Sequence, residues 1–248
     1  MKQSLLIVLS VFWLTATANT AQAWDKKDMA KLMKPNDCQN CNLSKANLSG
    51  ANLNGSNLSG TDLKGANLNG SNLTKANLSG AKLENADLRG ADLTMANLTG
   101  ADLRGTDLTG VKLKGANLSK AFLTQANLGS YNLSGANLSK ANLLKIVLSK
   151  ANLSKANLSG ANVSESNLSR ANLSGANLSG TTLVRANLSG ADLRGTDLTK
   201  TNLDRADLTG ADLRGTDLTK AILKGANLEG ATWTDGKKCA KGSIGKCN

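Results

Sequence analysis

Leucine recurs at every fifth position from Leu43 to Leu228, with Val163 as the one exception. The residue two places before each leucine is nearly always Ala, Ser or Thr, and the residue directly before it is usually Asn or Asp. On an α-helix a five-residue step rotates by about 500°, so these leucines would spread around the helix instead of forming one stripe. In an extended chain the small residue and the leucine point to one side, and Asn or Asp points to the other. The pattern therefore predicts very short strands that each bury one small residue and one leucine.

The position two residues after the leucine is often glycine, as in Gly50, Gly55 and Gly60. Glycine suits a tight corner because it adopts backbone conformations that other residues avoid. A chain that turns repeatedly in one sense and buries leucine and alanine becomes a solenoid, whose stacked coils exchange backbone hydrogen bonds. The 38 consecutive units from Leu43 to Leu228, and a further unit that ends in Trp233, predict such a rod.

Units such as ANLSG at 46–50, ADLRG at 101–105 and ADLTG at 206–210 resemble the pentapeptide-repeat family, and the resemblance covers residues 42–233. It implies an all-β fold, a right-handed quadrilateral β-helix with four units in each coil. On that basis the 39 units make about ten coils, or roughly 45 Å of rod at ~4.8 Å per coil. The period alone gives the inward and outward positions, whereas the four-sided section and the handedness come from the resemblance.

Residues 1–23 have the pattern of a secretory signal peptide. Lys2 precedes an apolar run from Leu5 to Leu14, and a small-residue motif ends at Ala23, so we expect cleavage between Ala23 and Trp24. The apolar run is too short for a membrane-spanning helix, so we expect no transmembrane segment after cleavage and a periplasmic or secreted protein. The alternative is an uncleaved segment that anchors the chain at a membrane surface.

Residues 24–41 are predicted to cap the first coil. Met29, Leu32 and Met33 have helical spacing and Pro35 ends the run, which indicates a short helix that covers an otherwise open strand edge. Contact of this segment with a membrane is the weaker alternative. The β-helix then occupies residues 42–233, and residues 234–248 form a C-terminal tail.

The four cysteines lie outside the uniform repeats, two near each end of the predicted rod. An even number of cysteines in an exported chain indicates disulfides, and local bridges from Cys38 to Cys41 and from Cys239 to Cys247 are the simplest pairing. The two pairs lie too far apart along the rod for one zinc site. A redox-active Cys38-x-x-Cys41 motif is the alternative, although that chemistry favours a thiolate at a helix N-terminus. We expect no metal and no cofactor.

The formal net charge is +12, and removal of the signal peptide takes away only Lys2, which leaves +11. Between residues 112 and 185 the chain has nine bases against the single acid Glu165, which predicts a strongly positive central band. The band either keeps the rod soluble or binds an anionic partner, which would be an unknown protein, an envelope polymer or a lipid headgroup. Nucleic acid is disfavoured by the predicted export and by the lack of interleaved aromatic residues. The band consists of Lys112, Lys114, Lys120, Lys140, Lys145, Lys150, Lys155, Arg170 and Arg185.

Some outward positions carry apolar residues. With four units per coil, Phe122, Leu144, Val184 and Ile222 fall on one side of the rod, which predicts a contact surface for a partner or for a homodimer. The alternative is scattered surface apolar residues, which are common. Elsewhere Tyr131 and Ile146 occupy the small inward position, so we expect a local distortion near each of them.

The Asp-Leu-Arg sequences at 192–194 and 212–214 lie four units apart, so their charges are predicted to pair across neighbouring coils.

The sequence argues against catalysis, because the chain has no histidine and its carboxylates recur at equivalent outward positions of a convex rod. The family resemblance implies a second possibility, a DNA mimic that binds type II topoisomerases. Such mimicry needs an acidic surface and a cytoplasmic protein, so it is disfavoured by the mature charge of +11 and by the predicted signal peptide. The sequence therefore favours an exported, non-catalytic scaffold.

Overall fold

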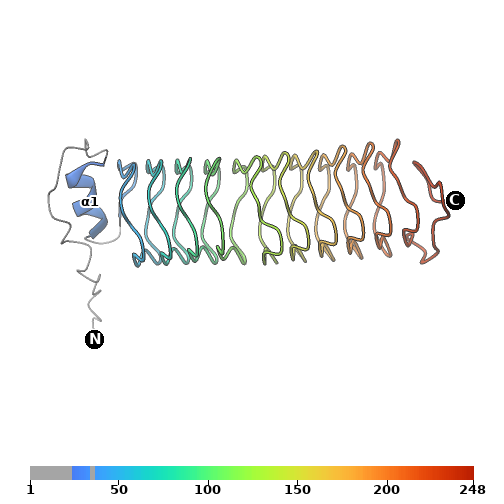
Figure 1. The fold of residues 1–248 in the computed structure, drawn as a ribbon, viewed down its shortest axis with the longest axis horizontal. Coiled ribbons are helices and arrows are strands. Elements are labelled where there is room, and N and C mark those ends of the chain that lie inside the picture. Colours follow the sequence, from blue (N-terminus) through green and yellow to red (C-terminus); the bar gives the residue numbers. More distant parts are fainter. Residues whose placement is uncertain (1–23, 34–36) are drawn as a thin grey trace, which may run out of the picture.

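The computed structural model of the protein describes residues 24–33 and 37–248, and its coils stack into an elongated rod (Figure 1). Two parts of the predicted N-terminal region lie outside the described residues. They are the predicted signal peptide, which ends at Ala23, and Pro35, which is predicted to end the helix. The first element is the helix α1, Lys26–Met33. From residue 37 onward the described chain forms isolated β-bridges and turns.

The coils are joined by parallel bridges between residues four units apart, from Asp37 with Asn57 to Asp212 with Thr232. At each rung the chain both donates and accepts: the Leu48 N–H donates to the Asn67 carbonyl at 2.7 Å, and the Asn67 N–H donates to the Ala46 carbonyl at 2.9 Å. Four five-residue units therefore complete one coil, and leucines four units apart stack directly on one another.

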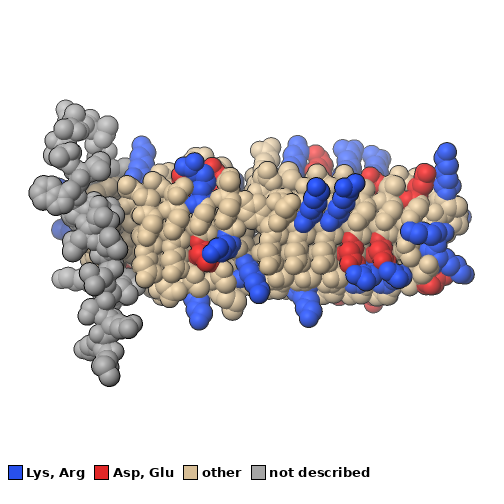
Figure 2. All heavy atoms as spheres, turned by 60° about the horizontal axis from the view of Figure 1, so that its bottom comes forward, with Lys and Arg blue, Asp and Glu red and all other residues tan. Residues whose placement is uncertain are grey.

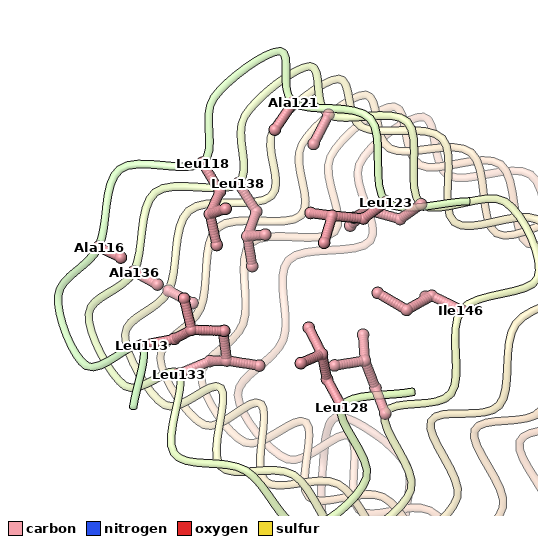
Figure 3. Close-up of a cluster of buried hydrophobic side chains, with 14 of the residues drawn as sticks. Leu113, Ala116, Leu118, Ala121, Leu123, Leu128, Leu133, Ala136, Leu138 and Ile146 are labelled. Atoms are coloured by element: carbon pink, nitrogen blue, oxygen red, sulfur yellow. The ribbon is translucent and has the colours of Figure 1, made fainter. Parts of the chain in front are cut away.

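The interior of the rod is filled by the leucine and alanine positions. Every residue in the leucine position from Leu43 to Leu213 is buried, and Figure 3 shows Leu113, Leu118 and Ala116 directed into the interior beside their counterparts in the next coil. Burial of one leucine side chain contributes about 2 kcal/mol. Stacking of near-identical coils repeats this contribution along the rod and stabilises a chain whose surface is polar.

Most corners are held by two local features. The Asn or Asp before the leucine accepts a hydrogen bond from the N–H two residues later, as between Asn47 Oδ1 and Ser49 N at 3.2 Å, which is an Asx turn. The residue two places after the leucine has a left-handed backbone, with φ of 65° at Gly50 and 56° at Lys140. Eighteen residues other than glycine have a positive φ, all at this corner position, and twelve of them are lysine or arginine.

The ladder is interrupted at Tyr131. In the described chain the bridges that would join residue 107 to 127 and 112 to 132 are missing. The Tyr131 hydroxyl replaces part of this pairing, since it accepts from the Gly110 N–H at 2.6 Å and donates to the Leu108 carbonyl at 3.0 Å. The predicted distortion is therefore present at Tyr131, and the even spacing of the coils is disturbed in the green part of the ribbon (Figure 1).

The distortion expected at Ile146 is not present. Ile146 is buried, and the bridges of the adjacent Val147 to Asn127 and to Asn167 are intact. Figure 3 shows the Ile146 side chain pointing into the interior, between Leu123 and Leu128. The residues stacked on either side of it, Ala126 and Ser166, are small, so the interior has room for the larger side chain.

The helix α1 covers the first coil. Asp25 begins it by accepting the Lys27 N–H at 2.7 Å, and Leu32 is buried against the core. Asp28 Oδ2 accepts the Asn42 N–H at 2.8 Å, which satisfies a donor at the strand edge. The hydrogen bond from Lys31, followed by that from the Asn42 backbone, lowers the pKa of Asp28 below its usual value.

The two cysteine pairs lie at opposite ends of the rod and are joined as disulfides, Cys38 to Cys41 and Cys239 to Cys247. The C-terminal tail returns along the last coil with antiparallel bridges from Asn227 to Ile244 and from Thr232 to Lys238. Within the described part of the chain no helix has both the length and the apolar character needed to cross a membrane.

Candidate functional site

The nine bases of the central band surround the rod instead of gathering on one surface. Lys140, Lys145, Lys150 and Lys155 occupy four successive corners, so one coil carries a lysine at each corner. All four side chains are exposed. In Figure 2 basic side chains project at intervals along the rod, both from the face in view and from its edges.

Two of these bases are paired with acids. Lys112 Nζ lies 3.1 Å from Asp92 Oδ2, and Lys145 Nζ lies 3.5 Å from Glu165 Oε2. Among the described residues, the other seven bases of the band form no ion pair within 4 Å.

The four apolar residues predicted to share a side do so. The ladder from Asp102 through Phe122, Asn142, Asn162, Thr182 and Asn202 to Ile222 is continuous. Phe122 is 43% exposed and Ile222 is 49% exposed, whereas Leu144 and Val184 are half-buried. We call this surface the Phe122 side; it comprises the stacked units whose leucine positions are 43, 63, 83, 103, 123, 143, 163, 183, 203 and 223, with the corner residues that flank them.

From residue 120 onward the two corners of the Phe122 side are rich in bases. Eight bases and two acids, Glu165 and Asp204, occupy this half, so its net charge is +6. The two acids lie near Lys145, at 3.5 Å, and Arg205, at 4.0 Å. The remaining bases form no ion pair within the described chain. The eight bases are Lys120, Lys140, Lys145, Arg185, Lys200, Arg205, Lys220 and Lys224.

The earlier half of the same side is charged but neutralised. Glu84 Oε1 lies 3.0 Å from Lys64 Nζ and 3.9 Å from Arg104, and Arg104 Nε donates to Asp102 Oδ1 at 2.8 Å. The hydrogen bond from Arg104 lowers the pKa of Asp102 below its usual value. Lys45, Lys64, Glu84 and Arg104 line a shallow depression of about 610 Å³.

A second charged ladder forms on another side near the C-terminal end. Arg194 donates to Asp192 through Nε at 2.8 Å and Nη2 at 2.7 Å, and its Nε lies 3.9 Å from Asp212 in the next coil. Arg214 Nη2 makes the equivalent contact with Asp212 at 2.6 Å. The predicted pairing is therefore mainly within each rung and weaker across rungs. Exposed pairs of this kind contribute about 0–1 kcal/mol each.

The carboxylates of these clusters are held in their ionised form. Hydrogen bonds from Arg104, Arg194 and Arg214 lower the pKa values of Asp102, Asp192 and Asp212 respectively. Carboxyl groups with lowered pKa are poor proton donors at neutral pH. The described residues contain no group of three or more His, Cys, Asp or Glu side chains placed to hold a metal ion. These three carboxylates are therefore better suited to ion pairing than to proton donation.

Two features of this surface were not predicted from the sequence. One is the depression around Glu84, and the other is the row of bases Lys200, Arg205, Lys220 and Lys224 on the Phe122 side. Counting charged residues by coil, with the four-unit spacing used for the apolar ones, would have found both sets.

The model of the family described as pentapeptide repeats matches residues 37–70, 71–110, 91–129, 132–170, 166–205 and 198–232. No curated protein matched the sequence. Among solved structures, the chain is similar to HetL, a pentapeptide repeat protein involved in heterocyst differentiation regulation from the cyanobacterium Nostoc sp. strain PCC 7120. The identity is 39%, the TM-score is 0.55, and the match covers 82% of this chain and 91% of HetL.

A second pentapeptide repeat protein from Nostoc is 35% identical over 42% of this chain and 84% of its own, with a TM-score of 0.36. QnrB1, a plasmid-mediated fluoroquinolone resistance protein, is 20% identical over 68% of this chain and 90% of its own, with a TM-score of 0.35. The likeness to HetL assigns the rod to the right-handed β-helices.

Proposed function

The chain belongs to the pentapeptide-repeat family, and from this premise we propose that it is an exported, non-catalytic scaffold that binds an anionic envelope partner through its basic central band. The rod provides a rigid support, and its outward side chains provide the specificity. A fold of this kind does not by itself define a function, so the proposal depends on the surface.

The basic corners are the observation that carries the proposal. Twelve lysines and arginines have the left-handed backbone that glycine adopts freely, for example Lys140 with φ of 56° and Arg170 with φ of 56°. This conformation costs an L-residue roughly 1–2 kcal/mol. Strained backbone that persists in a fold is often found where the side chain has a role. The presence of basic side chains at these strained corners therefore supports a role for their charge.

Export is supported by two features of the chain. Residues 1–23 have the order of a signal peptide, namely a basic residue, an apolar run and a small-residue motif. The disulfides Cys38 to Cys41 and Cys239 to Cys247 fit an oxidising compartment. The proposed location is the periplasm or the extracellular space.

A binding role is also supported by the similarity to HetL, which is 39% identical and is described as involved in the regulation of heterocyst differentiation. Regulation by a protein of this family is compatible with binding to a partner. For the partner of the present chain we propose only one property, a negative charge.

Cell fractionation with N-terminal sequencing of the mature protein tests export. We expect the envelope or extracellular fraction to contain a chain that begins at Trp24. A cytoplasmic chain with an intact N-terminus would exclude an envelope partner.

Cross-linking in intact cells, followed by isolation of the protein at low and high salt, tests partner binding. We expect a salt-sensitive partner that is reduced when Lys140, Lys145, Lys150 and Lys155 are all replaced by Gln. Undiminished capture by this variant would contradict a role for the band.

A further inference from the structure

We propose that the Phe122 side, from Lys120 to Lys224, binds an acidic amphipathic α-helix of a partner protein that lies along the rod. This inference rests on the proposed function and narrows it, since it names one surface of the rod and one kind of partner. Three properties of this half lead to it: its charge, its apolar spacing and its width.

The charge of this half favours an acidic occupant. Its net charge is +6, and seven of its eight bases lie on its two corners. Lys140 and Lys200 belong to one corner, and Arg185 and Arg205 belong to the other. Of these four, only Arg205 has an ion-pair partner among the described residues, Asp204 at 4.0 Å. An occupant between the corners would thus meet positive charge along both of its edges, which favours an acidic segment.

The apolar residues between the corners have a spacing that suits a helix. Phe122 and Leu144 lie in adjacent coils, Val184 lies two coils beyond Leu144, and Ile222 lies two coils beyond Val184. At ~4.8 Å per coil these steps are about 5, 10 and 10 Å. A helix advances about 5.4 Å per turn, so its apolar residues recur at about 5 and 11 Å along one face.

The width of the side also suits one helix. Each side comprises one five-residue unit, of which about three residues are extended, so the corners lie roughly 10 Å apart. A helix with its side chains is about 10–12 Å across. A single helix along the rod would therefore place its apolar face on Phe122 and Ile222 and its acidic flanks near the two corners.

Other occupants fit less well. A second copy of the chain carries the same positive charge, so two Phe122 sides would repel one another. An anionic bilayer would gain little from insertion, since only Phe122 and Ile222 of the four apolar residues are well exposed. A flexible polyanion would use bases on all corners and would not depend on the apolar residues.

A synthetic helix provides a direct test. The probe is a labelled 25-residue peptide with leucine at heptad positions a and d, glutamate at e and g, and alanine and glutamine elsewhere. Fluorescence anisotropy at low and physiological ionic strength measures its affinity for the full chain. The control peptide has the same composition in a scrambled order without an apolar face. We expect the helical probe to bind at least tenfold more tightly than the scrambled peptide.

Matched variants locate the site. The triple variant Lys140→Gln, Arg185→Gln and Lys200→Gln removes three bases from the Phe122 side. The control variant Lys75→Gln, Lys241→Gln and Lys246→Gln removes the same charge from elsewhere. We expect at least a tenfold loss of affinity for the first variant and less than a twofold loss for the second. Equal losses would show that only the total charge matters and would overturn the inference.

The apolar residues are tested separately. We expect at least a fivefold loss for Phe122→Ser with Leu144→Ser and almost none for Met95→Ser with Val147→Ser, which lie on other parts of the surface. Circular dichroism of each variant confirms that it is folded. Equal binding of the scrambled peptide, or binding to phosphatidylglycerol vesicles that shows the same dependence on the triple variant, would also overturn the inference.

Cross-linking in cells distinguishes this inference from the proposed function. If the triple variant of the Phe122 side still captures the envelope partner of the wild-type chain, the helix site is wrong and the scaffold function remains. If the wild-type chain captures no anionic partner, the proposed function itself is wrong.

Discussion

The two halves of the Phe122 side have the same interior and different surfaces. Before residue 105, Lys64, Glu84 and Arg104 form a connected set of ion pairs. After residue 120, bases such as Lys140 and Lys200 have no ion-pair partner in the described chain, and apolar side chains lie between them. The residues in the leucine position beneath both halves are buried, except Leu223 near the C-terminal end, which is partly buried. The comparison shows that a repeat rod can vary its surface coil by coil while its core stays constant.

The largest expected effect tests the shared core. Leu83→Ala in the first half and Leu143→Ala in the second each remove a fully buried side chain. Each is expected to lower the free energy of unfolding by about 3 kcal/mol, because it leaves a cavity as well as removing buried area. Urea unfolding followed by circular dichroism measures both values. Values that differ by more than about 1.5 kcal/mol, half of the expected effect, would show that the two halves do not share an equivalent core.

The next effect concerns Tyr131, near the junction of the two halves. Tyr131→Phe leaves the Gly110 N–H and the Leu108 carbonyl without the hydroxyl that they now contact. We expect a loss of about 0.5–1.5 kcal/mol, since the Gly110 N–H is exposed and can bond to water instead. Tyr131→Ala is expected to be less harmful, since the small residue allows the coils to pair.

Amide hydrogen exchange checks this interpretation of Tyr131. The amides of Leu108 and Leu113, which lack their usual partners in the next coil, should become more protected in Tyr131→Ala and not in Tyr131→Phe. Greater protection in both variants would mean that the hydroxyl does not hold the distorted coils.

Lowering the pH should change the stability of the two halves differently, and this effect is smaller than those of the substitutions above. The pKa of Asp102 is lowered by its hydrogen bond from Arg104, so the ionised carboxylate stabilises the fold at neutral pH. This contribution is lost as the pH falls through the lowered pKa. We expect Asp102→Asn to destabilise the rod by about 0.5 kcal/mol at pH 7, with the difference disappearing once the pH has fallen below the lowered pKa of Asp102.

Glu165→Gln is the control in the second half. Glu165 lies 3.5 Å from Lys145, and both side chains are about half exposed, so this pair should contribute less to stability. Thermal unfolding at several pH values gives the comparison. A destabilisation by Asp102→Asn that persisted unchanged in acid would rule out a contribution from its charge.

The smallest effect concerns the strained corners of the second half. Lys200 has φ of 58°, and Lys200→Gly is expected to raise the free energy of unfolding by about 0.5 kcal/mol, because relief of strain exceeds the added freedom of the unfolded chain. Lys224 has no positive φ, so Lys224→Gly should lower it by about 0.5 kcal/mol. Chemical denaturation measures both, and a loss in both variants would argue against strain at the corner.

Most of the fold follows from the five-residue period. The buried leucines, the turning corners and the solenoid are confirmed, because one physical requirement, burial of an inward pair, repeats in every unit. The family assignment is also confirmed. The role of Asn and Asp was not predicted, because an outward polar residue gives no sign that its side chain accepts a hydrogen bond and shapes the corner.

The irregular positions show why the remaining details did not follow. Ile146 and Tyr131 both replace a small inward residue, yet only Tyr131 disturbs the ladder. Ile146 lies between Ala126 and Ser166, whereas Tyr131 lies between Val111 and Ala151. Whether a large inward residue disturbs the ladder depends on the volumes of the residues four units away in each direction, and the adjacent residues in the sequence do not reveal these volumes. The bases on the Phe122 side were missed for the same reason, because they come together only when residues four units apart are compared.

The hydroxyl contact of Tyr131 has a consequence for the folding of so uniform a chain. Coils built from near-identical units would pair almost equally well if one slipped by a whole unit along its neighbour. Residues that depart from the repeat distinguish the correct alignment, and the Tyr131 hydroxyl contacts the Gly110 N–H and the Leu108 carbonyl in that alignment. The residue that interrupts the ladder therefore also favours one register of the coils over those shifted by a whole unit.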